Sequence, residues 1–599
     1  MLVYGDSAWL ETPRDKLATI AHGIEAVWRG PPGIVRHGDL VALFIAAGEL
    51  AQGLADADFA ASEADARTTT SDAAMRLLIA LARAVGRSWS SGFQELGESL
   101  LPLLHAVQEA PLPQEIRVSL PEGYAFYALY PEAYVEAAKA LANRPLKIVG
   151  LRSIGTGLAA AVAAGAGRHG AVTVRPAGHP FRRELRLSDD LAADLLSVPA
   201  AEFAIIDEGP GLSGSSFGCV ADFLEDRGVA RDRIHFFPSH PGPPGPEASP
   251  RHRARWDEAR RHTIGFDDLV LRAPDPAHRL EAWVADLVGE PVAPTPDISG
   301  GAWRKLHFHS EADWPPANTQ QERRKFLMET QDGPWLLKFA GLGRYGAEKL
   351  DLARALASAS FTAPVAGFRH GFMVERWLAD ARPLRALPAD RRGAVERIGR
   401  YLGFRAKEFP AERPGASLEE LAAMAVRNVS LALGEASARA LTPWTPRLEK
   451  LARFVHPVRT DNRLHAWEWL VADGRLIKAD ALDHHAAHDL VGCQDLAWDV
   501  AGAAVEFNLS PEETERLCVV AEREAGRPVA PELVDFLTPC YLAFQLGAFT
   551  LAADAHVDNP AEATRLRGAA RRYTDRLESR LGGGGPALAP SHLGEPSCG

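Results

Sequence analysis

The chain has 599 residues, a net charge of −12 at pH 7 and a pI near 5.9. This acidity argues against a general nucleic-acid-binding protein, because such proteins carry a basic surface for the phosphates. Hydrophobic residues make up 46% and charged residues 24% of the chain, as in ordinary globular proteins. One core rarely exceeds about 300 residues, so two large domains are expected.

The composition also bears on the cellular compartment. The five cysteines are scattered and show no metal-binding spacing, which favours free thiols in a reducing cytoplasm. The first residues, MLVYGDSAWLETPRDK, show no basic and apolar leader, and no apolar run approaches the ~20 residues of a membrane span. We therefore expect a cytoplasmic protein that acts on small molecules, without nucleic-acid or membrane partners.

The first half of the chain changes character near residue 116. Residues 14–110 have apolar residues at helical spacing and predict a helical N-terminal extension over 1–115. After it, compact apolar runs alternate with helical patterns, which predicts an α/β domain with a doubly wound parallel sheet over 116–290. The runs are LKIVGL (146–151), AVTVRP (171–176), EFAIID (202–207) and RIHFFP (233–238).

The second half follows a Pro/Gly-rich boundary at 289–303. KLHFHS (305–310) is strand-like, residues 324–340 resemble a hairpin turning at Asp332-Gly333, and helices dominate 381–452. We expect an α+β domain over 300–580 and a Gly-rich disordered tail over 581–599.

The stretch AIIDEGPGLSGSSF (204–217) places Asp207 and Glu208 after an apolar strand and before a loop of small residues. In open parallel sheets, ligands bind at the carboxyl ends of the strands. Small residues before a helix N-terminus can cradle a phosphate, and paired acids suit ribose hydroxyls or a Mg²⁺ ion held by them. The pattern predicts a sugar-phosphate site, although an ordinary strand–turn–helix connection is the alternative.

This stretch resembles the PRPP-binding motif of type I phosphoribosyltransferases, and VGLRSIGTGLAAAVAA (149–164) resembles their pyrophosphate loop. RPAGHPFRREL (175–185) lies where that family carries a mobile loop. The resemblance implies phosphoribosyl transfer from PRPP, held with Mg²⁺, with Asp207 and Glu208 as the catalytic acids. The implied PRPP-binding residues are Arg152, Ser153, Gly155, Arg182, Arg183, Asp207, Glu208, Gly211, Leu212, Ser213, Gly214 and Ser215.

One position departs from this family. Some members carry an Asp just before the Thr-Gly pair that can act as a general base, and here that position is Gly211. A base must then come from elsewhere, or the acceptor needs none. Because the family often dimerises, the resemblance also allows a homodimer.

The segment GPWLLKFAGLGRYGAEKLDLARAL (333–356) puts Lys338 on a strand and Glu348 at a helix start. A strand lysine paired with a helix glutamate is the arrangement with which kinases hold ATP phosphates. GFMVERWLAD (371–380) resembles the hinge of aminoglycoside and choline kinases, which implies ATP binding near Glu375 and Trp377. No ordinary Gly-rich loop precedes Lys338.

Residues 456–485 resemble the catalytic loop and metal-binding Asp of protein-kinase-like phosphotransferases, and QDLAWDVAGAA (494–504) resembles the helix start that follows in aminoglycoside phosphotransferases. The resemblance implies that Asp461 orients or deprotonates the accepting hydroxyl and that Asp480 binds Mg²⁺, with Asp483 as a second metal ligand. The Asn expected five residues after Asp461 is Ala466, so His465 or Glu468 would have to replace it.

The run DHHAAHD (483–489) contains three histidines and two acids. The spacing H-H-x-x-H puts at most two ligands on one helical face, so a polar rim of the active site is favoured over a transition-metal site.

Together these patterns predict a bifunctional transferase with PRPP and ATP as cosubstrates and Mg²⁺ as cofactor. The alternatives are that only the phosphoribosyltransferase-like half is catalytic, that only the kinase-like half is catalytic while the other senses PRPP, or that neither turns over and the chain is a nucleotide-responsive scaffold. The acceptor of either transfer is not readable from the residues.

Overall fold

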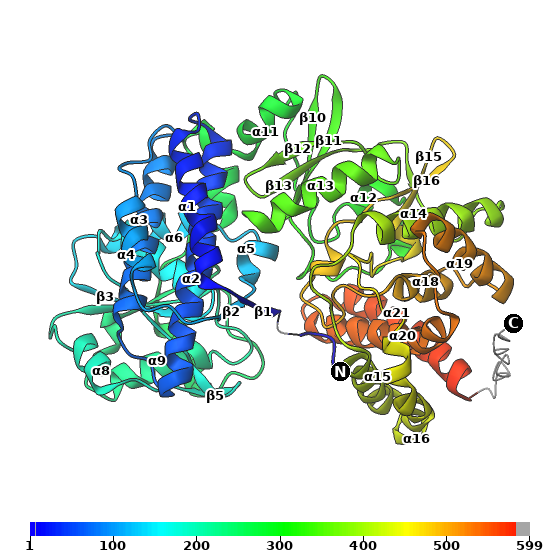
Figure 1. Ribbon diagram of the computed structural model, residues 1–599. Helices are drawn as coiled ribbons and strands as arrows, with labels where there is room; N and C mark the ends of the chain where they lie inside the picture. The colour runs from blue at the N-terminus through cyan, green and yellow to red at the C-terminus, as the bar shows by residue number, and fades with distance from the viewer. Residues whose placement is uncertain (6, 583–599) are drawn as a thin grey trace, which may run out of the picture.

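The computed structural model describes residues 1–5 and 7–582, which form the two halves seen side by side in Figure 1. The predicted disordered tail lies outside the described residues, except for its first two positions, which end the last helix, α21 (Pro560–Gly582).

Five strands of the first half form a parallel sheet in the order β4 (Val172–Val174), β3 (Leu146–Leu151), β7 (Glu202–Ile206), β8 (Ile234–Phe237) and β9 (Arg260–Arg261). From β3 the chain moves outward to β4 and then returns to the other side of β3 as β7. A sheet that grows in both directions from its first strand is doubly wound. The parallel sheet predicted from the four apolar runs is therefore confirmed, and the short β9 extends it.

Helices cover both faces of this sheet because its strands are apolar on both sides. Ile148, Ala204 and Ile206 pack into a core with α7 (Gly155–Gly165) and α6 (Pro131–Ala138), while Val149 and Ile205 belong to a second core on the opposite face. That second face is covered by α8 (Asp189–Leu195), α9 (Ser215–Glu225) and α10 (Pro250–Glu258). The glycine and alanine residues of α7 let it pack closely against the strands.

The N-terminal helices are α1 (Pro13–Arg29), α2 (Ile34–Ser62), α3 (Thr69–Ser90) and α4 (Leu101–Gln108). Thr68 and Ser71 form a reciprocal capping box at the start of α3. α2 and α3 both pack on α7, so the predicted helical region shares one core with the sheet. β1 (Ala8–Glu11) pairs with β2 (Ile116–Ser119), so a strand pair crosses the predicted domain boundary at residue 115. The boundary itself stays a prediction.

The second half begins with a four-stranded antiparallel sheet in the order β10 (Lys325–Thr330), β11 (Gly333–Phe339), β13 (Phe372–Arg376) and β12 (Val365–Arg369). The predicted hairpin is present and turns at Gln331-Asp332, and the next residue, Gly333, opens β11 with a φ of 97° that favours glycine. α13 (Arg344–Ser358) follows β11. The strand expected at 305–310 is absent, because residues Arg304–His307 form a short helix, α12, instead.

The remaining part is mainly helical and carries the small sheet β14 (Arg382–Pro383), β15 (Trp469–Ala472) and β16 (Arg475–Lys478). Its longer helices are α14 (Arg391–Glu408), α15 (Leu418–Leu433), α18 (Leu496–Glu506), α19 (Pro511–Ala525), α20 (Pro531–Ala555) and α21, and its short ones are α16 (Glu435–Ala438) and α17 (Leu448–Ala452). The helix start predicted at QDLAWD is confirmed, since the Asp495 side chain caps α18.

The two halves are joined by more than the connecting chain. One continuous core contains residues of α2, α3, α11 (Leu280–Val288) and the sheet β10–β13. The first residues reach the helical part, where the Leu2 amide donates to Asn428 and the Leu490 amide donates to the Val3 carbonyl. Figure 1 shows the N-terminus beside α15 for this reason. The relative position of the halves is thus set by packing at both ends of the chain.

Two helices, α2 and α20, are long and apolar enough to pass a test for membrane spans, contrary to the expectation that no such run exists. In the structure, 72% of the apolar window of α2 and 78% of that of α20 is buried. A helix that lies inside a protein core is apolar all round, so it passes the same test.

Candidate active site

A cleft of about 290 Å³ opens between the antiparallel sheet and the helical part of the second half. Strands β11, β13 and β16, the loop 479–489 and helix α20 all contribute to its walls. Phe126 and Tyr127, at the end of α5 (Glu122–Phe126), and Val3 and Tyr4 complete it from the first half of the chain. The predicted residues Lys338, Glu375, Trp377, Asp480 and Asp483 all line this cleft.

Lys338 is the central cation of the cleft. Its Nζ lies 2.8 Å from Asp480 Oδ1 and 2.5 Å from Asp483 Oδ2, and its side chain is 5% exposed. Burial would lower the pKa of Lys338, but the two carboxylates outweigh it and raise this pKa above its usual range. Lys338 therefore stays charged, and its ammonium has a third N–H to offer.

The predicted Lys338–Glu348 pair is wrong. Glu348 lies on the exposed side of α13, while the next residue, Lys349, points inward and places its Nζ 2.6 Å from Asp483 Oδ1. One position along a helix is a rotation of about 100°, which exchanges an inward for an outward side chain. Helical spacing identifies the inward face of α13, which consists of Lys349, Leu352, Ala353 and Leu356. This spacing includes Lys349 and not Glu348.

Asp483 is held from two sides. Its Oδ1 pairs with Lys349 and its Oδ2 with Lys338, so both oxygens are occupied by lysines. The predicted role of Asp483 as a second metal ligand stays a prediction, and it would require these lysine contacts to be shared with the ion. Asp480 is 27% exposed in the cleft and keeps Oδ2 away from Lys338. Asp480 is thus the acid that is open to a cation.

Glu375 and Trp377 lie where β13 reaches the cleft. Burial raises the pKa of Glu375 to about 7 against the opposing charge of Lys338. Trp377 lies beside His307, with their ring centroids 4.9 Å apart. Their predicted role in ATP binding stays a prediction.

Asp461 lies behind the cleft surface rather than on it. Its side chain is completely buried, receives a hydrogen bond from Tyr401 and lies 3.4 Å from Lys478 Nζ. Burial would raise the pKa of Asp461, but Lys478 and His484 outweigh it and hold this pKa well below its usual range. Asp461 is therefore a permanent carboxylate that cannot touch a molecule in the cleft, which corrects its predicted direct role.

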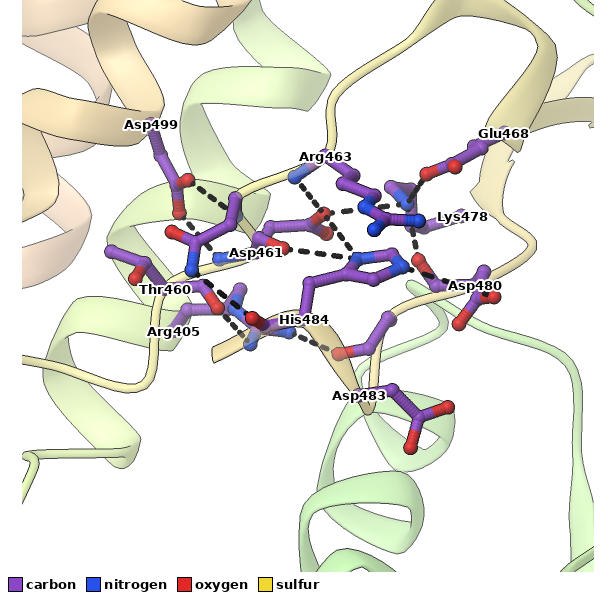
Figure 2. Close-up of polar contacts among 12 residues, drawn as sticks. Arg405, Thr460, Asp461, Arg463, Glu468, Lys478, Asp480, Asp483, His484 and Asp499 are labelled. Atoms are coloured by element: carbon purple, nitrogen blue, oxygen red, sulfur yellow. Dashed lines mark hydrogen bonds and ion pairs between the residues drawn. The ribbon is translucent and has the colours of Figure 1, made fainter. Parts of the chain in front are cut away.

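His484 lies between Asp461 and Asp480, as Figure 2 shows. Its Nδ1 is 3.1 Å from the Asp461 carbonyl oxygen and 3.6 Å from Asp461 Oδ1, and its Nε2 is 3.9 Å from Asp480 Oδ2. Both neighbours of Nδ1 are acceptors only, so the tautomer with its proton on Nδ1 suits this position and directs the Nε2 lone pair to the cleft side. His484 thus presents a base to the cleft with a carboxylate behind it.

The loop that carries Asp461 is fixed by two residues that the sequence did not single out. Asp499 of α18 accepts hydrogen bonds from the Asp461 and Asn462 amides at 2.7 and 2.9 Å. Arg405 of α14 donates to the carbonyls of Arg459, Thr460 and Ala481. Both anchors appear in Figure 2. The sequence signal that could have identified Arg405 is an arginine at a position of α14 where the helical spacing predicts a buried apolar residue.

The cleft offers hard oxygen donors for a magnesium ion. Asp480 lies in the cleft wall and Glu468, at the end of the loop, also lines it, 2.9 Å from Lys478. Mg²⁺ prefers carboxylate oxygens and water, so the open oxygen of Asp480 fits that ion. Glu468 is one of the two residues expected to replace the missing Asn; the other, His465, also lines the cleft and lies 3.1 Å from Glu506.

In the first half, Asp207 and Glu208 follow the central strand β7, at the side of the parallel sheet where its strands have their carboxyl ends, called the sheet edge below. The Glu208 carboxylate accepts a hydrogen bond from the Gly123 amide at 3.1 Å, and Asp207 Oδ1 accepts one from the Glu208 amide. Among the described residues, no lysine or arginine forms an ion pair with either acid. Burial raises the pKa of Asp207 to about 7 and that of Glu208 to about 8.

The small-residue loop is closed by a hairpin. Ser213 and Ser215 are buried, their Oγ atoms lie 2.8 Å apart, and Ser215 donates to the Pro180 carbonyl at 3.0 Å. Pro180 lies between β5 (Ala177–His179) and β6 (Arg182–Glu184), the segment expected to be mobile. Gly211 and Gly214 have positive φ angles of 59° and 64°, and Leu212 is 60% exposed. The hydroxyls predicted to bind phosphate are therefore engaged within the protein.

The arginines of this half differ in their availability. Arg152 is buried and its guanidinium pairs with Asp65 and, at 2.9 Å, with Asp56 of α2. These pairs correct its predicted role in PRPP binding, because all three nitrogens of the group donate to partners within the protein. Arg182 is exposed and Arg183 half-buried on β6. Ser153 lines a small cavity beside Gln52, and Gly155 begins α7.

No protein-family model matches the chain, and no curated protein sequence matches it. Solved structures resemble part of it. The choline kinase LicA from Streptococcus pneumoniae is 17% identical, with a TM-score of 0.30, over 42% of this chain and 89% of that chain. A macrolide 2'-phosphotransferase type I is 16% identical, with a TM-score of 0.31, over 49% of this chain and 95% of that chain.

A third structure, spectinomycin phosphotransferase APH(9)-Ia in complex with ADP and spectinomycin, is 10% identical, with a TM-score of 0.31, over 49% of this chain and 93% of that chain. Likenesses at this distance do not establish an activity for the chain.

Proposed function

We propose that the cleft transfers a phosphoryl group from ATP to a hydroxyl group of a small molecule. The proposal is carried by one observation, the convergence of Lys338, Asp480 and His484 on a single cavity. These residues supply a buried cation, a carboxylate open to a metal ion and a base with its lone pair on the cleft side. Positioning and charge neutralisation account for most of the catalysis of phosphoryl transfer.

Each residue has a defined task in this reaction. Lys338 donates its third N–H to the phosphates of ATP, and Asp480 would hold a Mg²⁺ ion that would supply further charge neutralisation. His484 Nε2 accepts the proton of the attacking hydroxyl. The Asp461 carboxylate, 3.6 Å from Nδ1, holds the imidazole in the required tautomer and stabilises the imidazolium that forms. Asp461 is thus a positioning residue.

Formation of ADP from ATP–Mg²⁺ tests this proposal, with a panel of small hydroxyl compounds as acceptors and water as the blank. We expect turnover in the wild type and its loss in Asp480→Asn. Asp473→Asn is the matched control, because Asp473 lies in the exposed turn of the same β15–β16 hairpin. Absence of both ADP formation and ATP binding in the wild type would overturn the proposal.

A second activity, at the carboxyl ends of the parallel strands, is favoured by Asp207 and Glu208, which lie together and form no ion pair with a lysine or arginine in the described part of the chain. We infer that they bind a sugar phosphate with its Mg²⁺, and PRPP with phosphoribosyl transfer is the specific candidate. The paired substitutions Asp207→Asn and Glu208→Gln should abolish pyrophosphate release from PRPP while sparing ADP formation at the cleft.

Binding of PRPP–Mg²⁺ to the native state must raise the melting temperature. A wild-type protein whose melting temperature does not respond to PRPP–Mg²⁺ would contradict this second activity and leave the first intact. A response to PRPP without pyrophosphate release would instead support a first half that senses PRPP and a second half that is catalytic.

A further inference from the structure

Three ionisable side chains meet in the interior where the two halves join. His37 comes from α2, Glu132 from α6 and His370 from the turn between β12 and β13. The Nε2 atoms of His37 and His370 lie 2.8 and 3.1 Å from Glu132 Oε1, and the side chains are 0–1% exposed. All three potential ligand atoms lie within 4.8 Å of one another.

The carboxylate of Glu132 is incompletely satisfied by this arrangement. Its Oε2 is buried and makes no hydrogen bond, and among the described residues its partners are the two imidazoles alone. Two N–H donors on Oε1 would leave an ionised carboxylate in the interior without a cation, which is an expensive state for a protein.

A bound divalent ion would both neutralise the buried charge of Glu132 and give its unpartnered Oε2 a ligand contact. Zinc bound by nitrogen and oxygen at about 2.0–2.2 Å keeps its ligands roughly 3.4 Å apart. The two nitrogen–oxygen separations, 2.8 and 3.1 Å, would therefore need to open by about 0.6 and 0.3 Å. Glu132 Oε2 can supply the fourth donor atom. His37 Nδ1 lies 2.9 Å from Ser88 Oγ, a partner that can fix the tautomer with the Nε2 lone pair directed at the ion.

The surroundings indicate which metal and which role. Imidazole nitrogens disfavour Mg²⁺ and Ca²⁺, whereas two histidines and a carboxylate suit zinc. The rings of Trp89, Phe93, Tyr130 and Trp283 surround the two histidines, with His37–Phe93 centroids 4.8 Å apart. The shell is apolar and the three side chains are 0–1% exposed, so a structural role fits the site better than contact with a substrate.

We propose that His37, Glu132 and His370 form a structural zinc site that fastens the first half of the chain to the antiparallel sheet of the second. The site is separate from both candidate active sites and uses no cysteine, in contrast to common structural zinc sites. It joins α2, which also carries the Asp56 partner of Arg152, to the β12–β13 turn.

Metal content of the purified full-length protein tests this site. We expect about one zinc per chain in the wild type and a loss of at least tenfold in Glu132→Gln and in His370→Asn. Asparagine is chosen because His370 has a φ of 38°, a region that asparagine tolerates. His278→Gln is the matched control, since His278 is a buried histidine that stacks on Trp89 outside the cluster.

Cobalt substitution of the chelator-treated wild type decides the case even if a variant fails to fold. Co²⁺ held by two imidazoles and a carboxylate gives visible ligand-field absorption without thiolate charge transfer, and Zn²⁺ should displace it. A wild type that retains no zinc and takes up no Co²⁺ would overturn the proposal and show a hydrogen-bonded cluster. Equal zinc in His370→Asn and His278→Gln would also overturn it.

Discussion

The acid pairs of the two halves follow strands in the same way but lie in opposite electrostatic surroundings. Asp480 and Asp483 face Lys338 and Lys349, and their pKa values are held below the usual range because these cations outweigh burial. Among the described residues, Asp207 and Glu208 form no ion pair with a lysine or arginine, and burial raises their pKa values to about 7 and about 8.

The difference teaches what each site needs. In the cleft, charge is balanced by the protein itself, so the site is ready for an anionic ligand that exchanges contacts with Lys338. At the sheet edge, charge is unbalanced, so the acids are protonated or must receive a cation from outside. The sequence shows two acids at each site. The lysines that distinguish the cleft from the sheet edge come from elements far from these acids in the chain.

Removal of the Lys338 ammonium should have the largest effect, because it takes away the charge balance that distinguishes the cleft from the sheet edge. Lys338→Met leaves Asp480 and Asp483 with one lysine fewer, and we expect ADP formation to fall by about 10³-fold. Loss of one partner of a buried ion pair should also lower the free energy of unfolding by about 3–5 kcal/mol. Steady-state kinetics and urea unfolding measure both effects. Lys325→Met, in the same cleft, is the control, and equal losses in both variants would contradict the assigned role.

Replacement of the proposed base is the next largest change. His484→Gln should lower kcat for ADP formation by about 10²-fold or more, with KM for ATP nearly unchanged, because the imidazole contacts the acceptor and not ATP. His485→Gln is the matched control, since the neighbouring ring does not line the cleft. If His484→Gln keeps the wild-type kcat, His484 is not the base and another group accepts the proton.

The acid pair at the sheet edge makes stability depend on pH. A carboxyl whose pKa is raised on folding stabilises the protein below its unfolded pKa, and this contribution is lost as pH rises through the folded value. For Asp207 and Glu208, the free energy of unfolding should fall between about pH 4 and pH 8.

The variant carrying Asp207→Asn and Glu208→Gln should remove this fall and be more stable than the wild type at pH 8 by roughly 1–3 kcal/mol. Chemical denaturation at several pH values measures the difference. An identical pH dependence in both proteins would mean that the acids titrate normally and that the contrast between the halves is false.

The smallest effect is expected at Glu348. Because this side chain faces solvent on α13, Glu348→Gln should leave ADP formation unchanged and shift the free energy of unfolding by less than about 0.5 kcal/mol. Lys349→Met, one residue along, should reduce both, since Lys349 pairs with Asp483. A large effect at Glu348 would restore the pairing that the sequence suggested.

The parallel sheet could be predicted because each strand is a local apolar run bounded by turns. Lys338 and Asp480 could be assigned to one site because the segments around them resemble those of protein-kinase-like phosphotransferases, and both residues line one cleft. The partners of these residues could not be predicted, because they depend on helix rotation and on contacts over long separations. Arg405 and Asp499, which fix the loop of Asp461, are examples, as is the Glu132 cluster, whose members His37 and His370 are far apart in the sequence.

Calorimetric titration of ATP–Mg²⁺ tests the central claim most directly, in the wild type, in Asp480→Asn, and in the variant carrying Asp207→Asn and Glu208→Gln. We predict one ATP–Mg²⁺ site in the wild type, affinity lowered at least tenfold in Asp480→Asn, and unchanged affinity in the sheet-edge variant. Wild-type affinity in Asp480→Asn, or its loss in the sheet-edge variant alone, would contradict the assignment of nucleotide binding to the cleft.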